Sequence, residues 1–130
     1  MNFLAHIYLS FGDEEIALGN FMADSIRGKN YQTLPLRIQK GVLLHREIDT
    51  YTDAHKIPRI SSKRLHKNYG HYSRVIVDIF YDHFLAKNWK AYYQEPLELF
   101  VDRFYDLLED NFTLLPDAVK RMVPYMVADN

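Results

Sequence analysis

Apolar residues recur at helical spacing along most of the chain, most clearly in the stretch Gly41–His55. Within it His45 and Asp49 are four residues apart, so a helix places the imidazole and the carboxylate on one face. Ile38 and Val42 precede them on that face, which predicts that the pair points inward. An inward carboxylate is costly unless it is paired or bound to a cation, so this stretch is the first candidate site.

The same spacing predicts an all-α chain. A helix beginning at Gly12–Glu15, where acids oppose the helix dipole, runs to about Ile26, and Gly19 inside it indicates close approach by a neighbour. The run Met1–Phe11 is apolar but too short for periodicity to separate helix from strand. Further helices are predicted from Leu36 onward and over Tyr72–Lys87, Pro96–Asn111 and Leu114–Ala128. The expected architecture is a compact helical bundle, with residues 1–130 forming a single domain.

One segment interrupts this pattern. Between Lys56 and Arg74, proline, serine and glycine residues predict a loop and a short helix rather than one long element. The segment contains no acid, and its bases are Lys56, Arg59, Lys63, Arg64, Lys67 and Arg74. Such a run is either a solvated face or a surface for an anionic partner.

Composition narrows the class of protein. The 130 residues are 48% hydrophobic and 15% aromatic, which excludes a disordered chain. A formal net charge of -1 predicts no general attraction to nucleic acid or membrane. No apolar run approaches the roughly 18 residues of a membrane span, and the N-terminus lacks the pattern of a signal peptide, so we expect a cytoplasmic protein. With no cysteine, any metal site must use histidine, carboxylates and water.

Polar residues four apart recur beside apolar residues, as the pairs Asn2/His6, Asn20/Asp24, His45/Asp49 and Asp78/Asp82. Taken alone, His6 is interpreted more simply as a core histidine, and Asp24 as a solvated residue near a helix end. Several such pairs in a short helical chain nevertheless predict a metal cluster inside the bundle. An oxygen-rich set with one or two imidazoles suits Mn²⁺, Mg²⁺ or Fe²⁺ better than structural zinc. The sequence has no phosphate loop, nucleophile elbow or Cys/His pair, which leaves metal-assisted hydrolysis as the simplest enzyme class.

Several blocks in order resemble the acyl carrier protein phosphodiesterase family across essentially the whole chain. These blocks are Met-Asn-Phe-Leu-Ala-His-Ile-Tyr-Leu-Ser at residues 1–10, Gly-Asn-Phe-Met-Ala-Asp at 19–24, Gly-Val-Leu-Leu-His-Arg-Glu-Ile-Asp at 41–49, Thr-Asp-Ala-His at 52–55 and Tyr-Asp-His-Phe-Leu-Ala at 81–86. The resemblance implies an all-α divergent relative of the HD-domain metal phosphohydrolases. It also implies removal of the 4′-phosphopantetheine arm from holo acyl carrier protein, with Mn²⁺ as the favoured metal. Family members usually continue past residues 126–130, so the implied bundle would lack the family's C-terminal helices.

Together, the spacing and the resemblance assign roles to particular residues. The predicted metal cluster comprises Asp24, His45, Asp49, Asp78 and Asp82, supported by His6 and Asn20. A serine leaving group needs a proton donor, for which His55 and His83 remain equal candidates. Arg46 is either a phosphate contact or an ordinary surface charge.

The resemblance also favours a role for the basic segment Lys56–Arg74 as the docking surface for acyl carrier protein, which is acidic. Two alternatives stay open. One is an HD-like phosphohydrolase that acts on nucleotides, and the other is a non-catalytic helical binding module.

Overall fold

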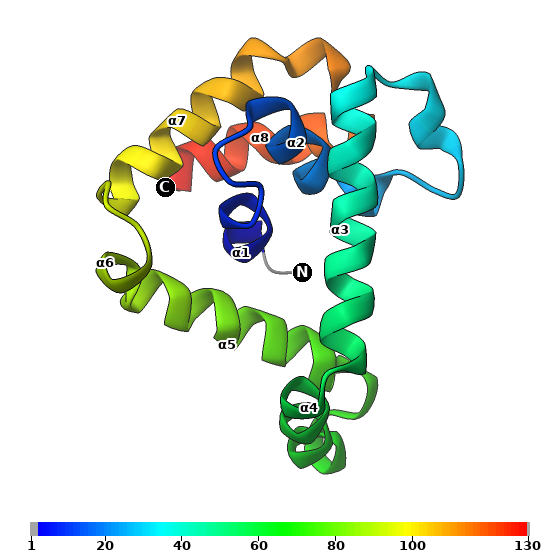
Figure 1. The fold of residues 1–130 in the computed structure, drawn as a ribbon, viewed down its shortest axis with the longest axis vertical. Coiled ribbons are helices and arrows are strands. Elements are labelled where there is room, and N and C mark those ends of the chain that lie inside the picture. Colours follow the sequence, from blue (N-terminus) through cyan, green and yellow to red (C-terminus); the bar gives the residue numbers. More distant parts are fainter. Residues whose placement is uncertain (1–2, 130) are drawn as a thin grey trace.

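The computed structural model describes residues 3–129, and every regular element in that range is a helix (Figure 1). The prediction of an all-α chain is therefore confirmed. The α-helices are α1 (Phe3–Tyr8), α2 (Glu14–Met22), α3 (Leu36–Ala54), α4 (Lys56–Tyr69), α5 (Ser73–Lys87), α6 (Trp89–Tyr92), α7 (Leu97–Asp110) and α8 (Asp117–Asp129). Short 3₁₀ turns join them at Ala23–Ser25, Asn30–Thr33, Gly70–Tyr72 and Phe112–Leu114.

The longest helices surround the N-terminal one. In Figure 1, α3 stands at the right, α5 runs along the lower side, α7 lies at the upper left, and α1 lies between them. Helix α1 packs against both α2 and α5, and α2 packs along α3. Residues near the start of the chain therefore lie between the two helices that carry the other predicted site residues.

The hydrophobic core brings together α2, the start of α3, and α7 and α8. Phe21 of α2 packs edge-on against Phe104 of α7 at 5.1 Å between ring centroids, and lies at a tilt against Phe3 of α1 at 4.8 Å. The buried core residues are Ala17, Leu18, Phe21, Met22, Ile38, Phe104, Leu108, Leu115, Val119 and Val123. This core fixes α2 and the first half of α3, whereas the second half of α3 extends beyond it toward α4 and α5.

Helices α2 and α3 touch backbone to backbone at two facing glycines. A Cβ atom placed on Gly19 would lie 2.0 Å from the carbonyl oxygen of Ile38, and one placed on Gly41 would lie 2.2 Å from that of Ile16. Only glycine allows this approach, as the sequence indicated for Gly19. The contact sets Asn20 of α2 directly against the face of α3 that carries His45.

Helix α2 begins where the sequence predicts, and the opening apolar run forms a helix. The side chain of Asp13 accepts a hydrogen bond from the backbone N–H of Ile16 at 3.0 Å, so α2 starts where the acids predicted. Its α-helical part ends at Met22, and Ala23–Ser25 continue as a 3₁₀ turn. The apolar opening run, undecided from sequence, is helical over Phe3–Tyr8.

The prediction of a loop and short helix over Lys56–Arg74 is wrong, because α4 is a continuous helix of 14 residues. Pro58 lies in its first turn, where a missing backbone N–H has no helical partner to lose. Gly70, at φ +56°, ends the helix in a conformation that favours glycine. None of the helices between residues 3 and 129 is both long enough and apolar enough to cross a membrane.

Candidate metal centre

Two histidines and one aspartate from α1 and α3 converge on one point. Nε2 of His45 lies 3.2 Å from one carboxylate oxygen of Asp49, and Nε2 of His6 lies 3.2 Å from the other. The two imidazole rings stack at 3.9 Å between centroids. One ligand atom from each residue lies within 4.8 Å of the other two, so the three side chains can share a single cation. Asn2, which the spacing paired with His6, lies outside the described residues.

Asp24 adds a second carboxylate to this centre. It follows α2 in the 3₁₀ turn Ala23–Ser25, and its Oδ1 lies 3.0 Å from Nε2 of His45. The carboxylates of Asp24 and Asp49 thus approach the same imidazole nitrogen, and each side chain is 48% exposed while the two histidines are buried. The centre therefore has buried nitrogen donors and oxygen donors open to solvent.

Asn20 orients the His45 ring. Its amide nitrogen donates to the carbonyl oxygen of His6 at 2.9 Å and to Oγ of Ser10 at 3.2 Å. Its amide oxygen then faces Nδ1 of His45 at 3.1 Å, which must carry a proton to donate to it. Nε2 of His45 is thereby directed at the carboxylates, as in metal-ligating histidines whose second nitrogen donates to a neighbouring oxygen.

The titration of His45 and Asp49 reflects their pairing. Burial lowers the pKa of His45, but hydrogen bonds to Asp24 and Asp49 outweigh it and raise that pKa to about 9. Burial raises the pKa of Asp49, but hydrogen bonds from His45 and His6 outweigh it and hold that pKa well below its usual range. The metal-free centre is consequently an imidazolium–carboxylate pair at neutral pH, and a metal would replace the proton of His45. Two imidazoles and one or two carboxylates are a donor set that fits a divalent metal.

Asp82 does not direct its oxygens at this centre. They accept hydrogen bonds from the backbone N–H groups of Leu4 at 3.0 Å and Ala5 at 2.9 Å, at the start of α1. Burial raises the pKa of Asp82, although these two bonds oppose the shift. Asp82 therefore attaches α1, and with it His6, to α5.

Asp78 lies near Asp49 across a groove. The groove has a volume of about 1230 Å³ and is lined by the second half of α3, by α4 and by the first half of α5. Asp49, Asp53 and Asp78 contribute its carboxylates. Burial raises the pKa of Asp78, and the charges of Asp49 and Asp53 raise it further. Asp49 belongs to both the groove and the metal centre, so the centre opens onto this space.

Much of the groove wall is basic. Five of the six bases noted in the segment Lys56–Arg74 line it, and only Arg64 does not. The lining bases are Lys56, Arg59, Lys63, Lys67 and Arg74. His66 and His71 also line the groove, with rings edge to face at 6.4 Å between centroids, and in the sequence they are distinguished only by lying in the basic segment.

Three other predicted residues lie elsewhere. Nδ1 of His55 accepts from the backbone N–H of Ile57 at 3.2 Å and caps α4. Neither His55 nor His83, both described by the structure, is among the groove-lining residues. Arg46 donates to the carbonyl oxygens of Gly28 at 2.8 Å and Ile26 at 3.1 Å, so it holds the loop that follows Asp24.

Comparison with known proteins gives a consistent family result. The family model described as acyl carrier protein phosphodiesterase matches residues 1–130. A protein of that name from Pectobacterium atrosepticum is 31% identical over 129 residues, covering 97% of this chain and 66% of the relative. One from Photorhabdus laumondii is 30% identical over 132 residues, covering 100% of this chain and 66% of the relative. One from Escherichia coli K12 is 32% identical over 126 residues, covering 95% of this chain and 63% of the relative.

The chain thus spans about two thirds or less of the length of these relatives. No solved structure matches it, so the resemblance to the HD-domain fold stays a prediction.

Proposed function

Because the chain belongs to the acyl carrier protein phosphodiesterase family, we propose that it hydrolyses the phosphodiester joining 4′-phosphopantetheine to a serine of holo acyl carrier protein. The products are apo acyl carrier protein and 4′-phosphopantetheine. The observation that carries the proposal is the position of Asp49, which belongs both to the cluster with His6 and His45 and to the groove. A phosphodiester lying at that end of the groove would be next to the candidate metal centre.

His6, His45 and Asp49 would hold a divalent metal, with Asp24 beside His45 as a further ligand. We propose Mn²⁺, with Mg²⁺ and Fe²⁺ as alternatives, because the donors are two imidazoles and one or two carboxylates and include no thiolate. When bound, the metal supplies Lewis-acid activation of water and neutralises charge on the phosphoryl group. Asp78 lines the same groove as Asp49, and we propose it as a residue that orients the water.

The surrounding residues would keep the donors in place. Asn20 holds Nε2 of His45 toward the carboxylates, and Asp82 fixes the start of α1 so that His6 stacks on His45. Arg46 fixes the loop after Asp24 through two carbonyl groups. These contacts preorganise the centre, which reduces the rearrangement needed on binding metal and substrate.

The serine oxygen must receive a proton as it leaves. His55 and His83 are the candidates from sequence. Neither lines the groove, so the structure gives that role no support. We therefore add His66 and His71, whose imidazoles line the groove, to the candidates for this proton donor. The sequence-based role of Arg46 as a phosphate contact has no support beyond its charge, since its donors hold the loop.

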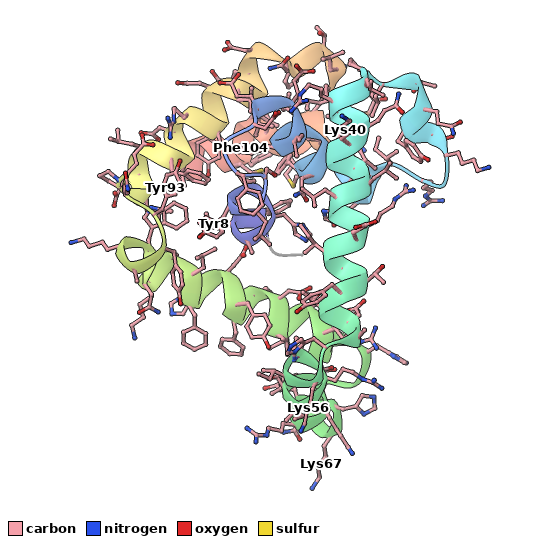
Figure 2. All side chains as sticks on the ribbon, viewed as in Figure 1. Tyr8, Lys40, Lys56, Lys67, Tyr93 and Phe104 are labelled. Carbon is pink, nitrogen blue, oxygen red and sulfur yellow. The ribbon has the colours of Figure 1, made fainter. Side chains whose placement is uncertain are left out.

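The basic side chains of α4 and α5 would also contact the protein substrate. Acyl carrier protein is acidic, and positive charge around the groove would steer its approach and set its orientation. The end of α4 that carries Lys67 projects away from the rest of the molecule in Figure 2, where an approaching protein can reach it. Docking on Lys56, Arg59, Lys63, Arg64, Lys67 and Arg74 is thus part of the proposal.

An activity panel tests this function against its alternatives. The chain is incubated with Mn²⁺ and either holo acyl carrier protein or a set of nucleotides, and released 4′-phosphopantetheine or phosphate is measured. The proposal predicts release from holo acyl carrier protein only. Turnover of nucleotides instead would favour a nucleotide phosphohydrolase, for which the basic groove is the supporting observation. No turnover and no retained metal would indicate a binding module.

A further inference from the structure

Most of the bases that line the groove have no ion-pair partner among the described side chains. Among the described side chains, which run from residue 3 to residue 128, Lys56, Arg59, Lys63 and Lys67 form no ion pair with a carboxylate, and Arg74 approaches Asp53 only at 3.9 Å. All five side chains are exposed. Like charges gathered around one hollow repel each other, and an anion bound among them would relieve this repulsion.

The shape of the groove favours a small molecule as that anion. Its volume of about 1230 Å³ exceeds the roughly 300–1,000 Å³ typical of small-molecule sites, so it has room for an extended ligand. A folded protein can cover the opening, but only an arm or a small molecule can enter. The walls are joined, because Oγ of Ser62 in α4 lies 3.0 Å from Oγ of the buried Ser73 in α5. The bases therefore surround a defined space rather than a flat surface.

The end of the groove that meets the candidate metal centre indicates which anion fits. The proposed function, on which this inference rests, puts the phosphoryl group of a pantetheine arm beside Asp49. The same arm and phosphoryl group occur on a nucleotide in coenzyme A, which carries further phosphates where acyl carrier protein carries its serine. We propose that the groove binds coenzyme A, with the pantetheine phosphoryl group near Asp49 and the nucleotide phosphates along the bases of α4 and α5. Each additional phosphate would form charge-assisted contacts with side chains that are otherwise unpaired.

Binding is measured by calorimetry on the full chain in chelator, so that the result does not depend on a metal or on turnover. The ligands are coenzyme A, dephospho-coenzyme A, pantetheine and inorganic pyrophosphate. Losing a phosphate removes contacts to charged groups, so we expect dephospho-coenzyme A to bind about tenfold more weakly than coenzyme A. Pantetheine, which has no phosphate, should show no measurable binding.

Charge reversal locates the site. The double variant Lys63→Glu/Lys67→Glu should weaken coenzyme A binding by roughly a hundredfold, since two attractions become repulsions. Lys40→Glu is the matched control, because Lys40 is exposed and lies at the end of α3 opposite Lys56 and Lys67 (Figure 2). It should change the affinity by less than about twofold. Circular dichroism checks that each variant retains its helical content.

Three results would overturn the proposal: no binding of coenzyme A, equal affinity for coenzyme A and inorganic pyrophosphate, or equal loss of affinity in the groove variant and in Lys40→Glu. The second would leave a general anion site. The proposed function is judged separately, since cleavage of holo acyl carrier protein without coenzyme A binding would retain the function and reject only this inference.

Discussion

Nδ1 of His45 lies 3.1 Å from the amide oxygen of Asn20, and this contact decides which imidazole nitrogen faces Asp24 and Asp49. Asn20 can hold that position because Gly19 and Gly41 let α2 and α3 touch. The orientation of a candidate ligand on one helix thus depends on two glycines and on an amide from another helix.

Replacing Asn20 tests this dependence. Asn20→Ala removes the hydrogen bond that orients His45, and loss of such a contact typically lowers metal affinity about 10–100-fold. Mn²⁺ affinity would be measured by competition with a chelator, with far-ultraviolet circular dichroism as the check on folding. Ser10→Ala is the control, because it removes one other contact of the same amide and leaves His45 oriented. Equal affinities for Asn20→Ala and the native chain would show that Asn20 does not orient the ligand.

The glycine contact has a measurable effect on stability. In an open helix, glycine to alanine stabilises by about 0.5–1 kcal/mol. At Gly19 the new methyl group would overlap the carbonyl oxygen of Ile38, so Gly19→Ala should instead destabilise the protein by roughly 1–3 kcal/mol or more. Urea unfolding gives the free energy. A gain in stability would mean that the two helices do not touch at Gly19.

A substitution at Asp82 distinguishes a structural role of this residue from metal binding. Asp82→Ala removes an acceptor for two backbone N–H groups of α1 and should cost roughly 1–3 kcal/mol of unfolding free energy. Since no oxygen of Asp82 is directed at the cluster, the number of metal ions bound per chain should not change. Metal analysis after dialysis provides the count. If fewer metal ions are bound per chain while the fold remains intact, Asp82 is a metal ligand, as the sequence predicts.

Asp78 gives a pH-dependent prediction for the metal-free protein. Burial raises its pKa above the ordinary 3.8, so its ionisation costs stability as the pH rises past that value. Asn cannot ionise, and Asp78→Asn should therefore be more stable than the native chain at about pH 7 but nearly equal to it at about pH 3. Thermal unfolding in chelator across this range gives the difference. A stability gain that does not grow with pH would show that the Asp78 carboxylate is not destabilised by burial.

Local patterns in the sequence predicted much of this arrangement. The four-residue spacing of His45 and Asp49 put both on one face of α3, and Ile38 and Val42 on that face are buried as predicted. The acids near Asp13 predicted the start of α2, and Gly19 indicated close packing. These features depend on residues close together in the chain, which helical periodicity relates directly.

Helical periodicity could not predict contacts between residues far apart in the chain. The bonds from Leu4 and Ala5 to Asp82 span 78 and 77 residues, and no local pattern pairs α1 with α5. The pairing of His6 with Asp49 is of the same kind. In α4, Pro58 and Gly70 indicate interruptions when only the sequence is considered, although a proline in the first turn and a glycine after the last are compatible with a continuous helix.

We propose that the cluster of His6, His45 and Asp49 supports cleavage of holo acyl carrier protein, and intact-mass spectrometry of that substrate measures this cleavage. With Mn²⁺, the native chain and the control Lys40→Glu should convert holo acyl carrier protein to the apo form with loss of the 4′-phosphopantetheine mass. Metal-stripped protein and a folded His45→Ala variant should leave the holo mass unchanged. Cleavage by either of them at the native rate would show that the reaction does not need the metal held by this cluster.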